Sequence, residues 1–191
     1  MDLSMILTHS ATDPDPYMRP QFTLQNKVYR FCWGMCWLML CSWTPKPLHN
    51  WRIWILRRFG AKIGKRNVVY PNCKIWAPWL LETDDYVTIG PGVEIYNPGG
   101  VKLGNHCILS QDSYLCGATH DYNSAEFTYV KKRIILESYT WICARAIVLP
   151  GVTCFEGSVL GAGSLTSRDL APWTVYAGNP AKAVKERTKF T

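Results

Sequence analysis

Aliphatic residues return at every sixth position through most of the chain, separated by polar and glycine-rich positions. The first series starts at Ile63, a second series two positions out of step starts at Ile89, and a third starts at Leu103. The period stops after Leu115 and resumes at Leu136. The members are Ile63, Val69, Ile75, Leu81, Val87, Ile89, Ile95, Val101, Leu103, Leu109, Leu115, Leu136, Ile142, Val148, Cys154, Leu160 and Thr166. This regularity predicts one repeated structural unit.

A six-residue period does not fit an α-helix, whose apolar face repeats about every 3.6 residues. It fits short parallel strands separated by tight corners, in which three strands close one coil of about 18 residues. Many members are followed four positions later by a slender residue such as Cys107 or Ala146, and Gly-Pro pairs suit the corners. An ordinary β-sandwich would show this spacing only by coincidence. We therefore predict an all-β solenoid, a parallel β-helix of about five coils over residues 61–170.

The interruption between Leu115 and Leu136 predicts a protruding loop over residues 121–133. Long loops in compact repeat folds are commonly functional. Of the four histidines, only His120 lies at this break. Because imidazole exchanges its proton near neutral pH, His120 is the candidate for acid–base chemistry.

The net charge of +7 is concentrated in one segment of the 191-residue chain. Residues 16–81 contain eleven Lys or Arg and no Asp or Glu, whereas residues 82–191 contain ten basic and eleven acidic residues. A nucleic-acid interface along the whole chain is therefore not expected. The eight cysteines form no CxxC pair and no export signal precedes them, so we expect reduced thiols and a cytoplasmic protein.

The front of the chain has a different composition from the repeat. Residues 1–25 are expected to form a flexible arm, and residues 26–60 a helical segment rich in Trp and basic residues. The apolar stretch 28–43 falls short of the roughly 20 residues that a membrane-crossing helix needs.

A second helix, expected over residues 48–59, places Trp51 and Trp54 among basic side chains. These are Arg52, Arg57 and Arg58. Aromatic rings beside cations suit the headgroup region of an anionic membrane, with the protein peripheral on its inner face. The alternative is that residues 28–59 cover the open end of the solenoid, whose strands otherwise present unpaired edges. Both interpretations stay open.

Motifs in the second half of the chain are typical of one protein family. They are Val148-Leu-Pro-Gly-Val-Thr153, Val159-Leu-Gly-Ala-Gly-Ser-Leu-Thr166 and Tyr176-Ala-Gly-Asn-Pro-Ala181. They resemble the hexapeptide-repeat acyltransferases, which fold as a left-handed β-helix. The run Tyr114-Leu-Cys-Gly-Ala-Thr-His-Asp121 resembles, more narrowly, the acetyltransferases of colanic acid and exopolysaccharide biosynthesis. The resemblance covers about residues 26–187 and implies a homotrimer; we expect a short helix in the C-terminal tail, residues 171–191.

The resemblance implies direct transfer of the acetyl group of acetyl-CoA to a sugar hydroxyl of an exopolysaccharide or lipid-linked glycan precursor. His120 matches the general base, and the absence of a GxSxG motif argues against an acyl-enzyme. The positions that match the donor site are Trp141, Ala144, Ala162, Ser167, Arg168, Lys182 and Lys185. Acceptor contacts are expected from Tyr96, Asn97 and Asp121. Either Asp121 or a backbone carbonyl would orient the His120 ring.

Two other functions stay open on the sequence. One is acetylation of another small acceptor, such as an amino sugar or an antibiotic-like molecule, and the other is a noncatalytic solenoid scaffold. A zinc site like that of the gamma-class carbonic anhydrases requires three suitably spaced histidines, which this sequence lacks. We therefore expect no metal.

Overall fold

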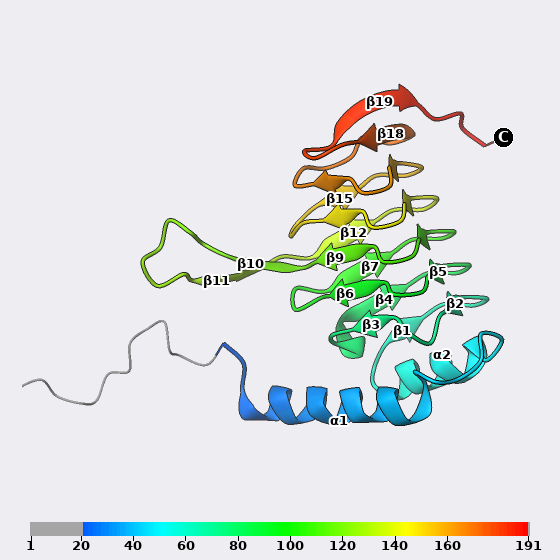
Figure 1. Cartoon of the computed structure of the whole chain (residues 1–191), viewed down its shortest axis with the longest axis vertical. Coiled ribbons are helices and arrows are strands. Elements are labelled where there is room, and N and C mark those ends of the chain that lie inside the picture. The colour runs from blue at the N-terminus through cyan, green and yellow to red at the C-terminus, as the bar shows by residue number, and fades with distance from the viewer. Residues whose placement is uncertain (1–20, 191) are drawn as a thin grey trace, which may run out of the picture.

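From Lys62 onward, strands of mostly two or three residues alternate with tight turns, and the chain winds into stacked triangular coils (Figure 1). This computed structural model describes residues 21–190, so most of the arm expected over residues 1–25 lies outside the described residues. Two helices precede the coils, α1 (Leu24–Leu40) and α2 (His49–Arg58). The predicted β-solenoid with an N-terminal helical segment is confirmed.

Each coil contributes one strand to each of three parallel sheets, which form the faces of a prism. The first sheet contains β1 (Lys62–Ile63), β4 (Leu81–Thr83), β7 (Val101–Leu103), β12 (Ile134–Leu136) and β15 (Thr153–Cys154). The second contains β2 (Val68–Val69), β5 (Thr88–Ile89), β8 (Ile108–Leu109), β13 (Trp141–Ile142), β16 (Val159–Leu160) and β18 (Thr174–Ala177). The third contains β3 (Lys74–Ile75), β6 (Glu94–Tyr96), β9 (Tyr114–Cys116), β14 (Ile147–Val148) and β17 (Leu165–Thr166). A partial sixth coil, begun by a bridge from Cys154 to Leu170, makes the stack slightly longer than expected.

The register between strands explains the two-position slips in the hydrophobic period. Lys62 pairs with Glu82 and Glu82 with Lys102, so each of these coils is twenty residues long. Later, Ile135 pairs with Thr153 in a coil of eighteen residues. The two extra residues lie in the first sheet, where three-residue strands bury both their first and third side chains. Every member of the six-residue series is buried, which confirms the predicted core.

The interrupted coil projects a β-hairpin out of the prism (Figure 1). Strand β10 (Ala118–His120) leaves from the third sheet and pairs antiparallel with β11 (Tyr129–Lys131), after which the chain returns to the first sheet. The predicted protrusion is therefore confirmed, although part of it is strand rather than loop.

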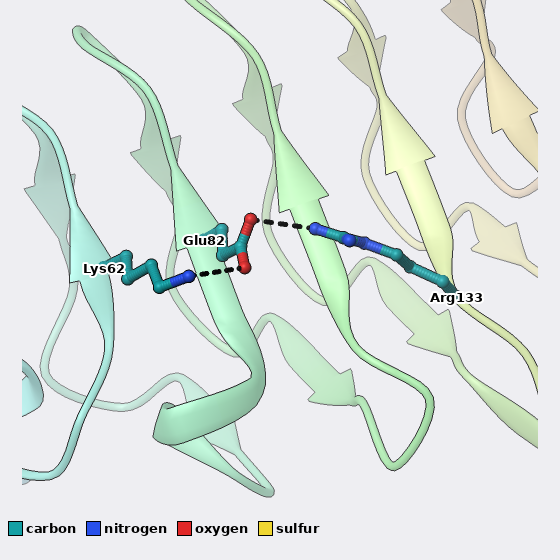
Figure 2. A network of polar contacts seen from close by, with 3 residues as sticks. All are labelled: Lys62, Glu82 and Arg133. Atoms are coloured by element: carbon teal, nitrogen blue, oxygen red, sulfur yellow. Dashed lines mark hydrogen bonds and ion pairs between the residues drawn. The ribbon is translucent and has the colours of Figure 1, made fainter.

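The return of this hairpin is fastened to the outer face of the first sheet by a polar network (Figure 2). Glu82 accepts a hydrogen bond from Lys62 at 3.2 Å and one from Arg133, just before β12, at 2.9 Å. The Lys62 hydrogen bond is the main cause that lowers the pKa of the Glu82 carboxyl, assisted by Arg133. The three side chains are partly solvated, so this network contributes to position more than to stability.

The two helices close the open end of the prism through one hydrogen-bond donor for each sheet. Strands β1, β2 and β3 are edge strands, and their outward carbonyls need partners. The carbonyls of Ile63, Val69 and Ile75 accept hydrogen bonds from the Arg57 guanidinium (2.8 Å), the Arg52 guanidinium (2.7 Å) and the Trp33 indole (2.7 Å), in that order. The capping interpretation of residues 28–59 is therefore confirmed.

The expectation of a C-terminal helix is wrong. Residues Lys182–Glu186 form β19, which pairs antiparallel with β18 and covers the last edge of the second sheet (Figure 1). A helix at this place would leave the backbone groups of that edge unpaired, so pairing decides against helical propensity.

Candidate active site

The imidazole of His120 is held by the hairpin that carries it. His120 is exposed at the end of β10, and its Nδ1 atom lies 2.6 Å from the carbonyl oxygen of Phe127. A carbonyl only accepts hydrogen bonds, so Nδ1 carries the proton of the neutral ring. The Nε2 atom then has its lone pair free, as a proton acceptor requires.

The hairpin turn supplies that carbonyl through backbone geometry. The Asp121 amide donates to the Thr128 carbonyl (2.9 Å), and the Phe127 amide donates to the Ser124 carbonyl (3.0 Å). Phe127 has a φ of 45°, in the left-handed region that a non-glycine residue adopts only under constraint. The Asp121 carboxylate instead accepts a hydrogen bond from the Asn123 amide (2.9 Å). Of the two alternatives for orienting His120, the structure places a backbone carbonyl at the ring.

Two tyrosines lie near His120: Tyr129 lies beside its ring, and Tyr96 lies against Tyr129. Tyr129 pairs with His120 across the hairpin, with ring centroids 5.5 Å apart, and its hydroxyl lies 2.8 Å from that of Tyr96. Burial, and then the hydrogen bond with Tyr96, raise the pKa of Tyr129, so its hydroxyl stays protonated. Phe22 contacts both Tyr129 and Trp76, which links the start of α1 to the hairpin. The sequence analysis did not single out Tyr129. Its position in the second half of the predicted loop 121–133 was the only sequence feature that pointed to it.

Two adjoining hollows run from the hairpin base to the end of the prism. The first, about 230 Å³, is lined by Thr119, Lys132 and Ser167 among others. The second, about 240 Å³, is lined by Ser167, Arg168 and Lys182. Ser167 belongs to both hollows. Three of the predicted donor residues are thus brought together beside the hairpin, at the corner between the third and first sheets.

The other predicted donor residues lie elsewhere on the prism. Trp141 is exposed on β13, and its indole donates to the Ser110 hydroxyl (2.9 Å); Ala144 and Ala162 occupy successive turns between the second and third sheets. The whole third sheet separates these turns from the corner between the third and first sheets, which carries the His120 hairpin and which we call the His120 corner. Lys185 lies on β19, exposed. A single chain therefore does not gather all predicted donor residues at one place.

One predicted acceptor residue is placed where it cannot serve. The Asn97 side chain is fully buried, and its amide exchanges hydrogen bonds with the backbone of Ala77 (2.9 and 3.0 Å). Its expected acceptor contact is therefore wrong, because it bridges two coils instead. Tyr96 is partly buried at the base of the hairpin, against Tyr129.

Residues 21–190 contain neither a candidate metal site nor a helix that could cross a membrane. Within that range, no cluster of three or more His, Cys, Asp or Glu side chains is placed to hold a metal ion. No helix of the described chain combines the length and apolar character that crossing a membrane demands.

Comparison with known proteins defines the class. No family model matches the chain. It is 39% identical over 164 residues to the Escherichia coli protein WcaF, named as an acetyltransferase of colanic acid biosynthesis, with 86% of this chain and 90% of WcaF covered. A hexapeptide-repeat acetyltransferase from Vibrio cholerae, solved with acetyl coenzyme A, superposes with a TM-score of 0.78 over 87% of this chain and 91% of its own, at 19% identity. A maltose O-acetyltransferase from Clostridium difficile gives 0.78 at 20% identity, with 87% and 90% covered.

The two solved structures share the parallel β-helix of this chain, which matches the left-handed β-helix fold of hexapeptide-repeat acetyltransferases. The chain belongs to the hexapeptide-repeat acetyltransferases.

Proposed function

We propose that this acetyltransferase transfers the acetyl group of acetyl-CoA to a sugar hydroxyl of an exopolysaccharide or lipid-linked glycan precursor, with His120 as general base. The observation that carries the proposal is the contact between His120 Nδ1 and the Phe127 carbonyl, which leaves Nε2 as the basic atom. Resemblance to WcaF, named for colanic acid biosynthesis, supports a glycan acceptor.

The reaction needs a group that accepts the hydroxyl proton and donors that stabilise the negative charge on the carbonyl oxygen. Nε2 of His120 takes the hydroxyl proton as the sugar oxygen attacks the thioester carbonyl. The carbonyl oxygen becomes an oxyanion, for which backbone amides near Ala144 are suitable donors. The C–S bond then breaks, the acetyl ester forms, and the coenzyme A thiolate takes the proton from His120. The Cys143 thiol gives no support to an acyl-enzyme route, because burial raises its pKa and makes it a poor nucleophile.

The donor would lie along the hollows that begin at the hairpin. Arg168 and Lys182 carry the charge to hold the phosphates of coenzyme A, and Ser167 adds a hydroxyl. Trp141 and Ala162 lie across the third sheet from this corner. We propose that a homotrimer brings the surface around Trp141 and Ala144 of one subunit against the His120 corner of the next, and that the site forms between them.

The same base could serve an amino group. One structural neighbour is AntD, an N-acyltransferase from Bacillus cereus solved with dTDP and coenzyme A, which superposes with a TM-score of 0.58 at 20% identity over 70% of this chain. We keep the hydroxyl as the acceptor because the more similar sequence is named for a polysaccharide pathway. The enzyme would work in the cytoplasm, at the inner face of the membrane where lipid-linked precursors lie.

The test combines purified enzyme with intact cells. Release of free thiol from acetyl-CoA is measured over a panel of sugars and amino sugars for the wild type and His120→Ala. We expect the variant to lose roughly 10²- to 10⁴-fold in rate, as removal of a general base does. Glu126→Gln, an exposed change in the same hairpin, is the matched control and should stay within about twofold. Unchanged thiol release in His120→Ala would remove His120 from the mechanism.

Mass spectrometry of the surface glycan from a strain lacking this chain identifies the acceptor. We expect one acetyl ester to be missing, at a position that names the sugar and hydroxyl. Loss of an N-acetyl group instead would favour the amino-sugar alternative, and an unaltered glycan would contradict the proposed acceptor.

A further inference from the structure

We propose that the outer face of α1, together with the Trp51–Trp54 pair of α2, docks on the surface of an anionic lipid bilayer. This inference rests on the proposed location at a membrane, and it identifies the surface and the lipid charge involved. Capping of the prism explains one side of the helical segment and leaves the other side without a role.

Helix α1 has two apolar sides, although a helix that only caps needs one. Trp33 and Trp37 are buried against the first coil. On the opposite side, apolar residues at spacings of three and four are exposed, and we call these the outer face. They are Leu24, Val28, Phe31, Met35 and Leu38. Exposures of 76% for Leu24, 70% for Phe31 and 61% for Leu38 show that no described residue covers this side.

Helix α2 extends the apolar surface with tryptophans. The rings of Trp51 and Trp54 stack at 5.3 Å with 18° between their planes, and both are exposed. Trp43, between the helices, is 71% exposed. The indole nitrogens of Trp43 and Trp51 donate to nearby carbonyls of α1, so their hydrogen bonds are satisfied within the chain. Indoles of this kind are suited to the bilayer interface.

The charges near this surface favour anionic lipid over other partners. Arg52 and Arg57 cap the first coil, but Lys27 on α1, Lys46 between the helices and Arg58 at the end of α2 are exposed. The Arg58 guanidinium lies 5.0 Å from the centroid of the Trp54 ring. No Asp or Glu occurs between residues 16 and 81, so no carboxylate of the segment neutralises them. A surface that is both apolar and basic matches the acyl–headgroup boundary of an anionic leaflet.

The position of the helices is compatible with catalysis at a membrane. Helix α1 lies across one end of the stack, whereas the hairpin projects from its side (Figure 1). Docking through the outer face would leave the His120 corner uncovered and near the lipid surface, where a lipid-linked acceptor is held.

Sedimentation with vesicles tests the inference without any acetyl transfer. Full-length protein is mixed with phosphatidylglycerol-containing or pure phosphatidylcholine vesicles at low and high salt. We expect binding to the anionic vesicles only, weakened by high salt. The double variant Phe31→Ser/Leu38→Ser should bind at least about tenfold more weakly, because two exposed apolar side chains no longer insert.

The matched control is Val184→Ser, which changes a 63% exposed residue at the other end of the stack. It should bind like the wild type, and circular dichroism should show all proteins folded. Absence of wild-type binding, or equal binding by the double variant, overturns the inference. If the wild type does not bind vesicles and the double variant has a lower oligomeric mass than the wild type on light scattering, the inference is overturned and the surface is assigned to a second copy of the chain. Activity on soluble acceptors is measured separately, so failure of docking and failure of acetyl transfer are distinguishable.

Discussion

At the scale of single residues, two neighbouring tryptophans show how similar side chains can have different energetic roles. The Trp33 and Trp37 rings pack with their centroids 5.1 Å apart and their planes tilted by 45°, and both side chains are buried under the first coil. The Trp33 indole donates to the Ile75 carbonyl, whereas the Trp37 indole nitrogen has no hydrogen-bond partner among the described residues. An unpaired buried donor carries its full desolvation cost.

We therefore predict that two conservative substitutions lower the free energy of unfolding by different amounts. Trp33→Phe leaves a buried carbonyl unsatisfied and should lower the free energy of unfolding by about 1–3 kcal/mol beyond the loss in ring size. Trp37→Phe removes an unsatisfied donor and should cost at least about 1 kcal/mol less. Urea unfolding followed by circular dichroism measures both. Equal losses would show that ring packing alone matters.

At the scale of elements, the turns of the prism do more than join strands. The corner between the first and second sheets stacks Tyr86, His106 and Tyr139, with centroids 4.7 and 4.8 Å apart and planes within 11°. All three residues have positive φ. Gly157 stands at the next turn, and Trp173 packs directly over it. The absence of a side chain at Gly157 therefore leaves room for the Trp173 ring at this corner.

Two glycines in the same backbone region test this account. Gly157 (φ 67°) would place a Cβ 2.5 Å from the Trp173 ring, whereas Gly163 (φ 66°) has open space around it. Both alanine variants pay the left-handed strain, roughly 1 kcal/mol. Gly157→Ala should cost at least about 1 kcal/mol more, because Trp173 must move. Thermal unfolding and tryptophan emission measure the difference; matching midpoints and spectra would contradict the close contact.

At the scale of the whole molecule, the separation of the donor residues gives the proposed trimer its purpose. Ser167 and Arg168 lie at the His120 corner, whereas Trp141 lies on β13 of the second sheet, with the third sheet between them. If one site uses both regions, it must be completed by a second subunit.

Mixed trimers test whether the site is shared. His120→Ala and Trp141→Ala are expected to be inactive or strongly impaired alone. When they are co-expressed with separate tags, one of the three interfaces in every trimer that carries both tags pairs an intact His120 with an intact Trp141, so activity should partly return. Thiol release by doubly tagged trimers is the measurement, with each variant co-expressed with itself as the control. No recovery would place both residues of a site in one chain.

Much of the fold could be predicted because the hexapeptide spacing is a local property of the chain. The position of each inward-facing aliphatic residue follows from its place in the six-residue series, and Leu103 and Ile142 are buried as that series predicts. Val87 shows the limit: it continues the arithmetic series, but it occupies a corner position four residues after Thr83, because the coil gains two residues in β4.

The solenoid, the break at His120 and the helical, basic front of the chain can all be predicted from the amino-acid sequence, because each follows from spacing or composition. Which groups meet across coils is visible only in the folded chain. The hairpin turn brings the Phe127 carbonyl to His120, and the Asn97 side chain hydrogen-bonds to the backbone of Ala77. The C-terminal segment forms strand β19 where a helix was expected. The physical reason is that unpaired backbone groups and buried polar atoms are satisfied by whatever the folded chain places beside them, and spacing along the sequence does not specify those partners.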